Sequence, residues 1–139
     1  MHKKKGNAEV KTIHVVPHSH DDVGWLKTVE EYFDGSHQDL QFTNVKTELS
    51  TIVESLLRDS RRTFSFVEMK YFSMWWDEQT ELMKQNVRGL VNRGQLELVN
   101  GGWSMHDEAC PTYSDFIENM MLGHDFILKE FGIKPRIGW

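Results

Sequence analysis

One short segment, VPHSHDDVGWL at residues 16–26, gathers two histidines and two aspartates within five positions. Imidazole nitrogen and carboxylate oxygen are ligands that zinc accepts, at about 2.0 to 2.2 Å. His20 and Asp22 would lie about 200° apart on a helix, but they share a face in an extended chain. The segment therefore predicts half of a metal site, with two further ligands supplied from elsewhere.

The residues before this segment predict the extended backbone that the pair needs. TIHVVP, residues 12–17, is a β-branched run that ends at a proline, which is typical of a buried strand. His14 alternates within that run and is expected to be a buried histidine. A competing interpretation is that Asp21 or Asp22 caps a helix that begins near Trp25. The spacing alone leaves both interpretations open.

Strand-like segments alternate with helix-like segments along the rest of the chain. The expected helices cover residues 25–34 and 44–60, a pair within 69–94, and 114–131, and the further strands cover 63–68, 95–103 and 135–139. Such alternation is typical of an α/β fold with parallel strands, whose catalytic groups lie in loops at the carboxyl ends of the strands. We therefore expect the loops after Pro17 and Asn100 to lie at that edge.

Three further residues could assist His20 and Asp22 without binding the metal themselves. Asp21 lies between the two ligands, and His18 could orient Asp22 or merely close the end of the strand. Asp107, with Glu108 beside it, follows the third strand and could bond to a ligand in the same cleft. Capping of the helix expected near residue 114 is the alternative for these two acids.

Other conspicuous residues have structural interpretations. Trp75 and Trp76 lie at helical spacing with other aromatic residues, which favours a core position over a carbohydrate platform. Met120 and Met121 are expected to fill the core. A tight turn is expected at residues 101–102, because no lysine or threonine follows this glycine pair in the register of a phosphate loop.

Composition excludes several classes of protein. Sixteen Lys and Arg against 21 Asp and Glu leave a net charge of −5, and a nucleic-acid binder would carry a basic face. No apolar run approaches the roughly 20 residues that span a bilayer, and no apolar stretch follows the basic start as in a signal peptide. Cys110 is the single cysteine, so no disulfide forms within these residues. Residues 1–11 are expected to form a disordered tail.

Three separated blocks of this sequence carry a family resemblance. TIHVVPHSHDDVGWLKTVEEYF, FVEMKYFSMWWDEQT and GQLELVNGGWSMHDEA, followed by RIGW, occur in this order. They resemble the amino-terminal region of the class II α-mannosidases of glycoside hydrolase family 38. The likeness covers residues 12–139, and Asp21 favours the lysosomal branch, since Golgi-type relatives carry asparagine there. The implied fold is the amino-terminal part of a parallel-stranded (β/α) barrel-like domain, truncated within a strand.

The resemblance implies a role for three residues of this chain. His20 and Asp22 match the first two protein ligands of the family's zinc, which chelates two adjacent hydroxyls of mannose. Trp25 matches the tryptophan on which that sugar stacks. The implied activity is hydrolysis of terminal α-D-mannose from N-glycans with retention of configuration, and the implied compartment is the lysosome, the vacuole or the secretory pathway.

The resemblance also implies what these 139 residues lack. The family's nucleophile is an aspartate three positions beyond Trp139, and the general acid and a further zinc-binding histidine lie later. The remainder of the polypeptide should therefore complete the site, and the fragment alone should be inactive. One alternative is a non-catalytic fragment as it stands. The other is a metallo-hydrolase of the HxHxD type, which has Val23 where the metallo-β-lactamase pattern needs histidine.

Overall fold

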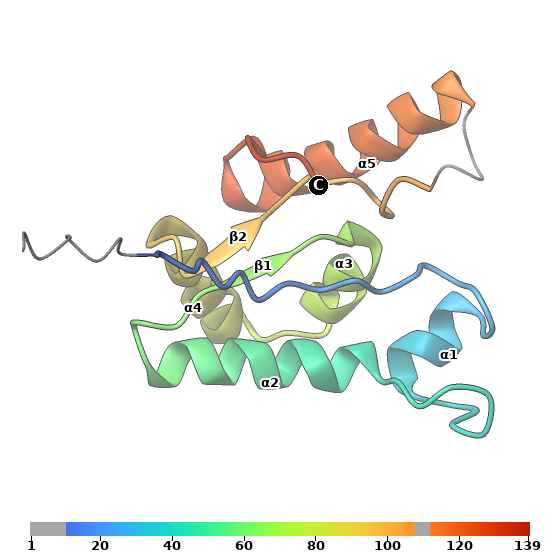
Figure 1. The fold of residues 1–139 in the computed structure, drawn as a ribbon, viewed down its shortest axis with the longest axis horizontal. Helices are drawn as coiled ribbons and strands as arrows, with labels where there is room; N and C mark the ends of the chain where they lie inside the picture. The colour runs from blue at the N-terminus through green and yellow to red at the C-terminus, as the bar shows by residue number, and fades with distance from the viewer. Residues whose placement is uncertain (1–10, 108–111) are drawn as a thin grey trace, which may run out of the picture.

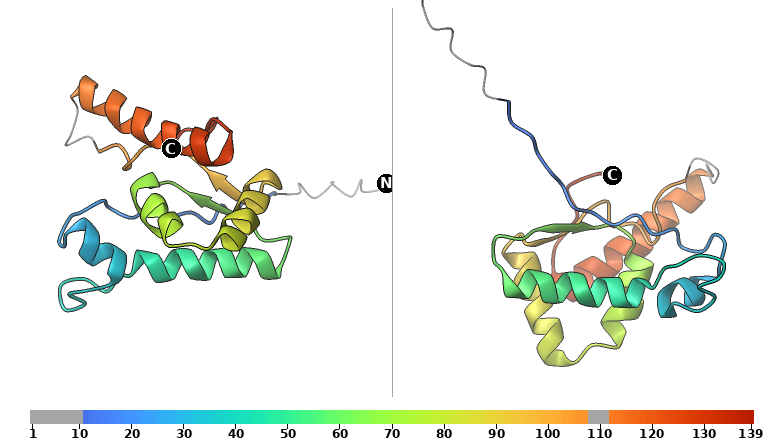
Figure 2. Two further views of the ribbon diagram at one scale, coloured as in Figure 1. Left: turned by 180° about the vertical axis from the view of Figure 1, so that it is seen from behind. Right: turned by 60° about the horizontal axis from the view of Figure 1, so that its bottom comes forward.

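The structure is a computed structural model that describes residues 11–107 and 112–139. In chain order the elements of this part are α1 (Val29–Asp34), α2 (Val45–Arg58), β1 (Phe64–Phe66), α3 (Met69–Asp77), α4 (Glu81–Asn92), β2 (Leu96–Leu98) and α5 (Tyr113–Phe131). In Figure 1, α2 lies below the two strands and α5 lies above them, and Figure 2 shows the same arrangement from behind. The arrangement is an α/β one, as the alternation predicted.

β1 and β2 form a parallel pair in which Phe64 lies opposite Leu96. Two neighbouring parallel strands must be joined by a crossover connection, and here α3 and α4 form it. Backbone groups of alternate β1 residues point to opposite edges of the strand, so the edge of β1 away from β2 can also form hydrogen bonds. The Ser65 N–H donates to the Pro17 carbonyl at 2.9 Å, and the Ser19 N–H donates to the Ser65 carbonyl at 3.1 Å. The segment that precedes the histidine-aspartate cluster therefore runs beside β1.

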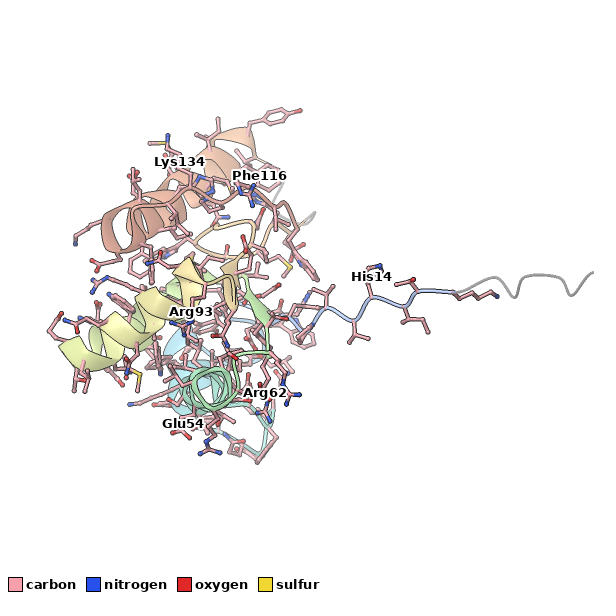
Figure 3. All side chains as sticks on the ribbon, turned by 90° about the vertical axis from the view of Figure 1, so that its left-hand side faces the viewer. His14, Glu54, Arg62, Arg93, Phe116 and Lys134 are labelled. Carbon is pink, nitrogen blue, oxygen red and sulfur yellow. The ribbon has the colours of Figure 1, made fainter. Side chains whose placement is uncertain are left out.

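The strands expected at the two ends of the chain are not formed as regular strands. Residues 12–17 contain no strand, and Ile13 and Val15 are 86% and 84% exposed because no described element covers them. His14 is exposed too, so its expected burial is wrong, and Figure 3 shows it on the extended segment that leaves the body of the chain. At the other end, one backbone bond, from the Asn100 N–H to the Ile137 carbonyl at 2.7 Å, replaces the strand expected over 135–139.

Aromatic side chains of α3 form the centre of the core. Phe72 is fully buried, and its ring centroid lies 5.7 to 6.3 Å from those of Phe66, Trp75, Trp76, Phe126 and Phe131. Aromatic pairs at such separations attract one another in addition to the area they bury. The expected core position of the two tryptophans is therefore confirmed, and the same cluster docks α5 onto α3.

The apolar side of α5 is only partly buried. Ile127 is fully buried, whereas Ile117, Met121 and Leu128 are 60%, 57% and 47% exposed. The expectation that Met121 fills the core is therefore wrong. The reason is that α5 meets α3 through its carboxyl-terminal half, while its amino-terminal half extends beyond the strands, as Figure 1 shows.

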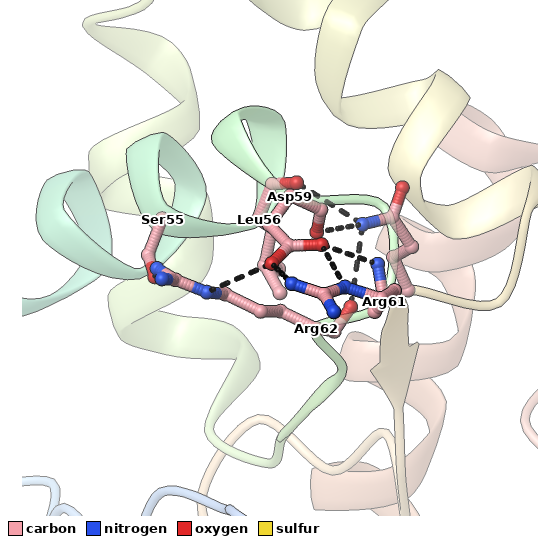
Figure 4. Close-up of polar contacts among 6 residues, drawn as sticks. Ser55, Leu56, Asp59, Arg61 and Arg62 are labelled. Carbon is pink, nitrogen blue, oxygen red and sulfur yellow. Dashed lines mark hydrogen bonds and ion pairs between the residues drawn. The ribbon is translucent and has the colours of Figure 1, made fainter.

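The turn between α2 and β1 is held by one buried amide (Figure 4). The Nε2 atom of Gln95 donates to the backbone carbonyls of Leu56 at 3.0 Å and of Asp59 and Arg62 at 3.2 Å. Asp59 also accepts bonds from the Arg61 side chain and backbone, which lower the pKa of its carboxyl to about 2. The amide thereby fixes the start of β2 against the end of α2.

We expect Gln95→Leu to lower the free energy of unfolding by about 2 kcal/mol, because buried carbonyls lose their donor. Gln79→Leu is the matched control. The Gln79 amide donates one partly buried bond to the Trp75 carbonyl, so its loss should cost no more than about 1 kcal/mol. Denaturant unfolding of the two variants measures the difference, and equal losses would contradict the role given to Gln95.

Candidate active site

The two loops that were expected to meet do line one pocket, at the carboxyl ends of the strands. This open pocket has a volume of about 690 Å³. Its lining comprises residues 20–25 of the first loop, residues 104–107 of the loop after β2, and Asp115, Phe116 and Asn119 of α5. His20, Asp22, Trp25 and Asp107, four of the residues singled out from sequence, thus share one cavity.

His20 and Asp22 face each other across this pocket wall. The Nε2 atom of His20 lies 3.9 Å from the Oδ1 atom of Asp22, and both side chains are more than half exposed. Two ligands of a tetrahedral zinc at about 2.1 Å lie about 3.4 Å from each other, so the pair fits one ion with a small adjustment. Within the described part of the chain, no group of three or more His, Cys, Asp or Glu side chains could hold a metal. The described residues thus offer at most this pair of donors at the pocket.

The interpretation of the aspartates as helix caps is wrong. α1 begins at Val29, later than expected, and its N-cap is Thr28, whose side chain accepts from the Glu31 N–H while the Glu31 carboxylate accepts from the Thr28 N–H. This reciprocal capping box satisfies the first turn without either aspartate. Asp21 and Asp22 therefore cap no helix, and both line the pocket.

The backbone around His20 is bonded to the first turn of α3. Glu68, fully buried, accepts from the Ser19 hydroxyl at 2.8 Å and from the Asp21 N–H at 2.9 Å. The hydroxyl of Tyr71 donates to the carbonyl of Asp22 at 2.7 Å. Burial raises the pKa of the Glu68 carboxyl above its usual value. Three hydrogen bonds thus hold the backbone of residues 19–22 against Glu68 and Tyr71.

Sequence reasoning missed Ser19, Glu68 and Tyr71. The available signal was an acidic residue directly after a strand, inside the apolar run FSFVEMKYF. A carboxylate in such a run must find donors when it is buried. Its partners could not be named, since Ser19 and Glu68 are 49 positions apart in the chain.

Asp21 differs electrostatically from its neighbour Asp22. The pKa of Asp21 is raised to about 7, first by burial and then by the negative charges of Glu68, Glu48 and Asp22. Below neutral pH this carboxyl is therefore mostly protonated and can donate a hydrogen bond. The neighbouring Asp22 side chain is 53% exposed in the same pocket.

His18 lies beside the pocket residues but does not bond to Asp22 in the described structure. Its Nδ1 atom lies 2.9 Å from the Ser19 carbonyl oxygen, and its ring centroid lies 4.2 Å from that of Trp139. The Trp139 indole N–H in turn donates to the Met105 sulfur at 3.2 Å. His18 thus connects the first loop, through Trp139, with the loop after β2.

Trp25 presents its indole to the pocket. The side chain is 68% exposed and follows Gly24, whose φ of +82° permits the turn that brings the indole there. The Trp25 N–H donates to the Lys27 carbonyl at 3.1 Å. The Lys27 ammonium is buried and donates to the carbonyls of Ser36 at 2.7 Å and Gln41 at 3.0 Å. An exposed aromatic face on a held backbone can stack against the apolar side of a sugar.

The second loop is shaped by glycines and held by α5. Gly101 has a φ of +76°, which confirms the expected tight turn. The Asn119 side chain accepts from the Ser104 N–H at 2.8 Å and donates to the Ser104 carbonyl at 2.8 Å. This loop brings Asp107 to the pocket, whereas Glu108 and Cys110 lie outside the described residues.

A second cavity, of about 730 Å³, lies along the exposed side of α5. Most of its lining side chains are apolar, as Phe116 is, and Lys134 also lines it. Figure 3 shows Phe116 and Lys134 on the α5 side of the molecule. It contains neither His20 nor Asp22. The pocket between the two loops is therefore the candidate active site.

Comparison with known proteins shows the family of this chain. Residues 10–139 match the family described as the glycosyl hydrolases family 38 N-terminal domain. The chain belongs to glycoside hydrolase family 38. It is 54% identical over 127 residues to a probable alpha-mannosidase of Arabidopsis thaliana, covering 91% of this chain and 12% of the relative.

Two further relatives of this family carry the lysosomal name. The lysosomal alpha-mannosidase of Dictyostelium discoideum is 47% identical over 137 residues, which is 99% of this chain and 14% of that protein. The human lysosomal alpha-mannosidase is 45% identical over 129 residues, which is 91% of this chain and 13% of that protein. The chain thus spans about one eighth of the length of these relatives.

Over the described residues, no helix has the length and apolar character needed to cross a bilayer.

Proposed function

We propose that this chain is the amino-terminal part of a zinc-dependent retaining α-mannosidase that removes terminal α-D-mannose from N-glycans and mannosides. The observation that carries the proposal is the His20–Asp22 pair, 3.9 Å apart in a family 38 chain and beside the exposed Trp25 in one pocket. An imidazole nitrogen and a carboxylate oxygen are a donor set that suits zinc. His20 and Asp22 would hold the ion, which supplies Lewis-acid polarisation and a template for the sugar hydroxyls.

The residues of this chain bind and orient in this proposal. Trp25 would support the apolar side of the mannose ring, and Asp107, from the loop after β2 that lines the same pocket, would bond to its polar side. A retaining glycosidase needs a nucleophile and a general acid about 5 to 5.5 Å apart. We place both in the remainder of the polypeptide, which would complete the (β/α) barrel-like domain of which residues 12–139 are a part.

The compartment proposed is the lysosome or vacuole, as the names of the lysosomal relatives suggest. The substrate is a mannose-containing oligosaccharide, and we propose neither a nucleic acid nor a membrane as partner.

Removal of the metal from the complete polypeptide tests this function. Hydrolysis of a chromogenic α-mannoside should fall to background after dialysis against a chelator and should return when Zn²⁺ is restored. A product released first as the α-anomer would show retention. Full activity in protein shown to be free of metal would contradict the proposal.

Two controls separate the alternatives. A phosphoester and a β-lactam should not be cleaved, whereas their cleavage without mannoside hydrolysis would favour the HxHxD metallo-hydrolase. The 139 residues alone should give no mannoside turnover, because they offer two metal donors and no nucleophile in our assignment. Turnover by the purified 139-residue chain would overturn that assignment.

A further inference from the structure

We infer that Glu68, which directly precedes α3, and Tyr71, in the first turn of α3, are positioning residues that hold His20 and Asp22 in the geometry that binds the metal. The inference rests on the proposed function. Neither side chain lines the pocket, so both act through the backbone of the first loop. We call these two side chains the α3 clamp.

Glu68 grips the loop on both sides of His20. Its Oε2 atom accepts from the Ser19 hydroxyl at 2.8 Å, and its Oε1 atom accepts from the Asp21 N–H at 2.9 Å. The Ser19 hydroxyl also accepts from the Val67 N–H at 3.0 Å, so the serine is tied to the end of β1 as well. Because both carboxylate oxygens are used, a rotation of the carboxylate cannot keep one bond and release the other.

Tyr71 fixes the loop at the second ligand. It lies three positions after Glu68, and residues at that spacing share a helix face. Its hydroxyl donates to the Asp22 carbonyl at 2.7 Å, and the ring is fully buried. The clamp therefore holds the residue before His20, the residue after it, and Asp22 itself.

The ligand side chains themselves are poorly restrained. The side chains of His20 and Asp22 are 62% and 53% exposed, and the only described contact between them is their 3.9 Å separation. Their relative position is therefore determined by the backbone that carries them. Residues that orient metal ligands from outside the coordination sphere typically change metal affinity by about tenfold to hundredfold.

The α3 clamp is rigid because α3 itself is held at its start. The N–H groups of Met69 and Lys70 donate to the carbonyls of Gly102 at 3.1 Å and Trp103 at 2.8 Å. These carbonyls satisfy the free donors of the first turn, a role usually taken by a capping side chain, and Glu68 makes no such cap. Its carboxylate is thereby available for the first loop.

The test measures the zinc affinity of metal-free complete polypeptide by competition with a chromophoric chelator. Glu68→Gln and Tyr71→Phe should each weaken zinc binding, and together by about tenfold to hundredfold. Their mannosidase activity should return in excess Zn²⁺, because mass action restores a weakened site but not a misfolded one. Tyr71→Phe removes only a hydroxyl, so it decides the question even when Glu68→Gln does not fold.

Two controls interpret the result. Gln95→Leu, a destabilising change at the opposite end of the strands, should leave zinc affinity unchanged. His20→Ala should weaken zinc binding more than either change in the α3 clamp. Unchanged affinity in Tyr71→Phe, and in Glu68→Gln where that variant folds, with His20→Ala weakened, would overturn this inference and leave the proposed function intact. Unchanged affinity in His20→Ala would overturn the proposed metal site, and the inference with it.

Discussion

Replacement of His20 by alanine should lower the mannosidase activity of the complete polypeptide by more than about a hundredfold. In the proposed site the change removes one of the two donors that face each other at 3.9 Å, and a zinc ion bound by fewer ligands would be lost or displaced. Because the His20 side chain is 62% exposed, the free energy of unfolding should change by less than about 0.5 kcal/mol. Steady-state hydrolysis of a chromogenic α-mannoside and a thermal melt measure the two effects.

His37 supplies the matched control. Its Nε2 atom lies 3.3 Å from the Glu31 carboxylate, and its side chain is 57% exposed, so it too is a surface histidine beside an acid. It lies outside the pocket lining and has a positive φ of 51°, which asparagine tolerates. His37→Asn should therefore retain activity. Equal activity of the His20 and His37 variants would remove the imidazole from the proposed site.

Replacement of Gly123 by alanine should lower the free energy of unfolding by at least about 3 kcal/mol. Gly123 is buried in α5 where that helix packs on the glycine turn after β2. An added Cβ would overlap the Gly101 carbonyl oxygen and would lie 2.7 Å from the Gly102 carbonyl carbon. Backbone atoms cannot rotate away as a side chain can, so α5 must move off the turn, and overpacking of this kind is strongly destabilising.

Gly89 provides the control within α4. There an added Cβ would meet the Arg93 guanidinium at 2.9 Å, which is the far end of a flexible side chain. Gly89→Ala should therefore stabilise the chain by up to about 1 kcal/mol, since alanine is the better helix former. Denaturant unfolding of both variants would show shifts of opposite sign, and a stabilised Gly123→Ala would contradict the packing of α5 described here.

Gly123→Ala should also disturb the geometry of the candidate active site. The same turn provides the Gly102 and Trp103 carbonyls that accept from the first N–H groups of α3. Asn119, one turn before Gly123 on α5, bonds to Ser104 in the pocket lining. Both walls of the pocket therefore depend on how closely α5 approaches the turn.

Much of this architecture was predictable from local pattern. α2 has apolar residues at helical spacing and a capping asparagine, Asn44, so its bounds of Val45–Arg58 nearly match the expected range. The pair α3 and α4, the strands β1 and β2, and the glycine turn at Gly101 follow in the same way. Each of these features depends on residues only a few positions apart, and such local patterns can be recognised in the sequence alone.

Two segments differ from the sequence-based expectation, one for a distant and one for a local reason. Ile13 and Val15 have the composition of a buried strand, but burial needs neighbours on both faces and the described residues cover neither side chain. α1 begins at Val29 because Thr28 and Glu31 form a capping box, which was available in the sequence and was overlooked.

The sequence by itself determined which chemical groups are present: an imidazole and a carboxylate two positions apart, a tryptophan three positions later, and the blocks that mark the family. Only the tertiary structure decided that Asp107 shares their pocket and that Glu68 and Tyr71 hold the backbone between the two donors. The physical reason is that residue types are set locally, whereas a buried carboxylate finds its partners through folding. Ser19 and Glu68 meet because parallel pairing places their two segments side by side.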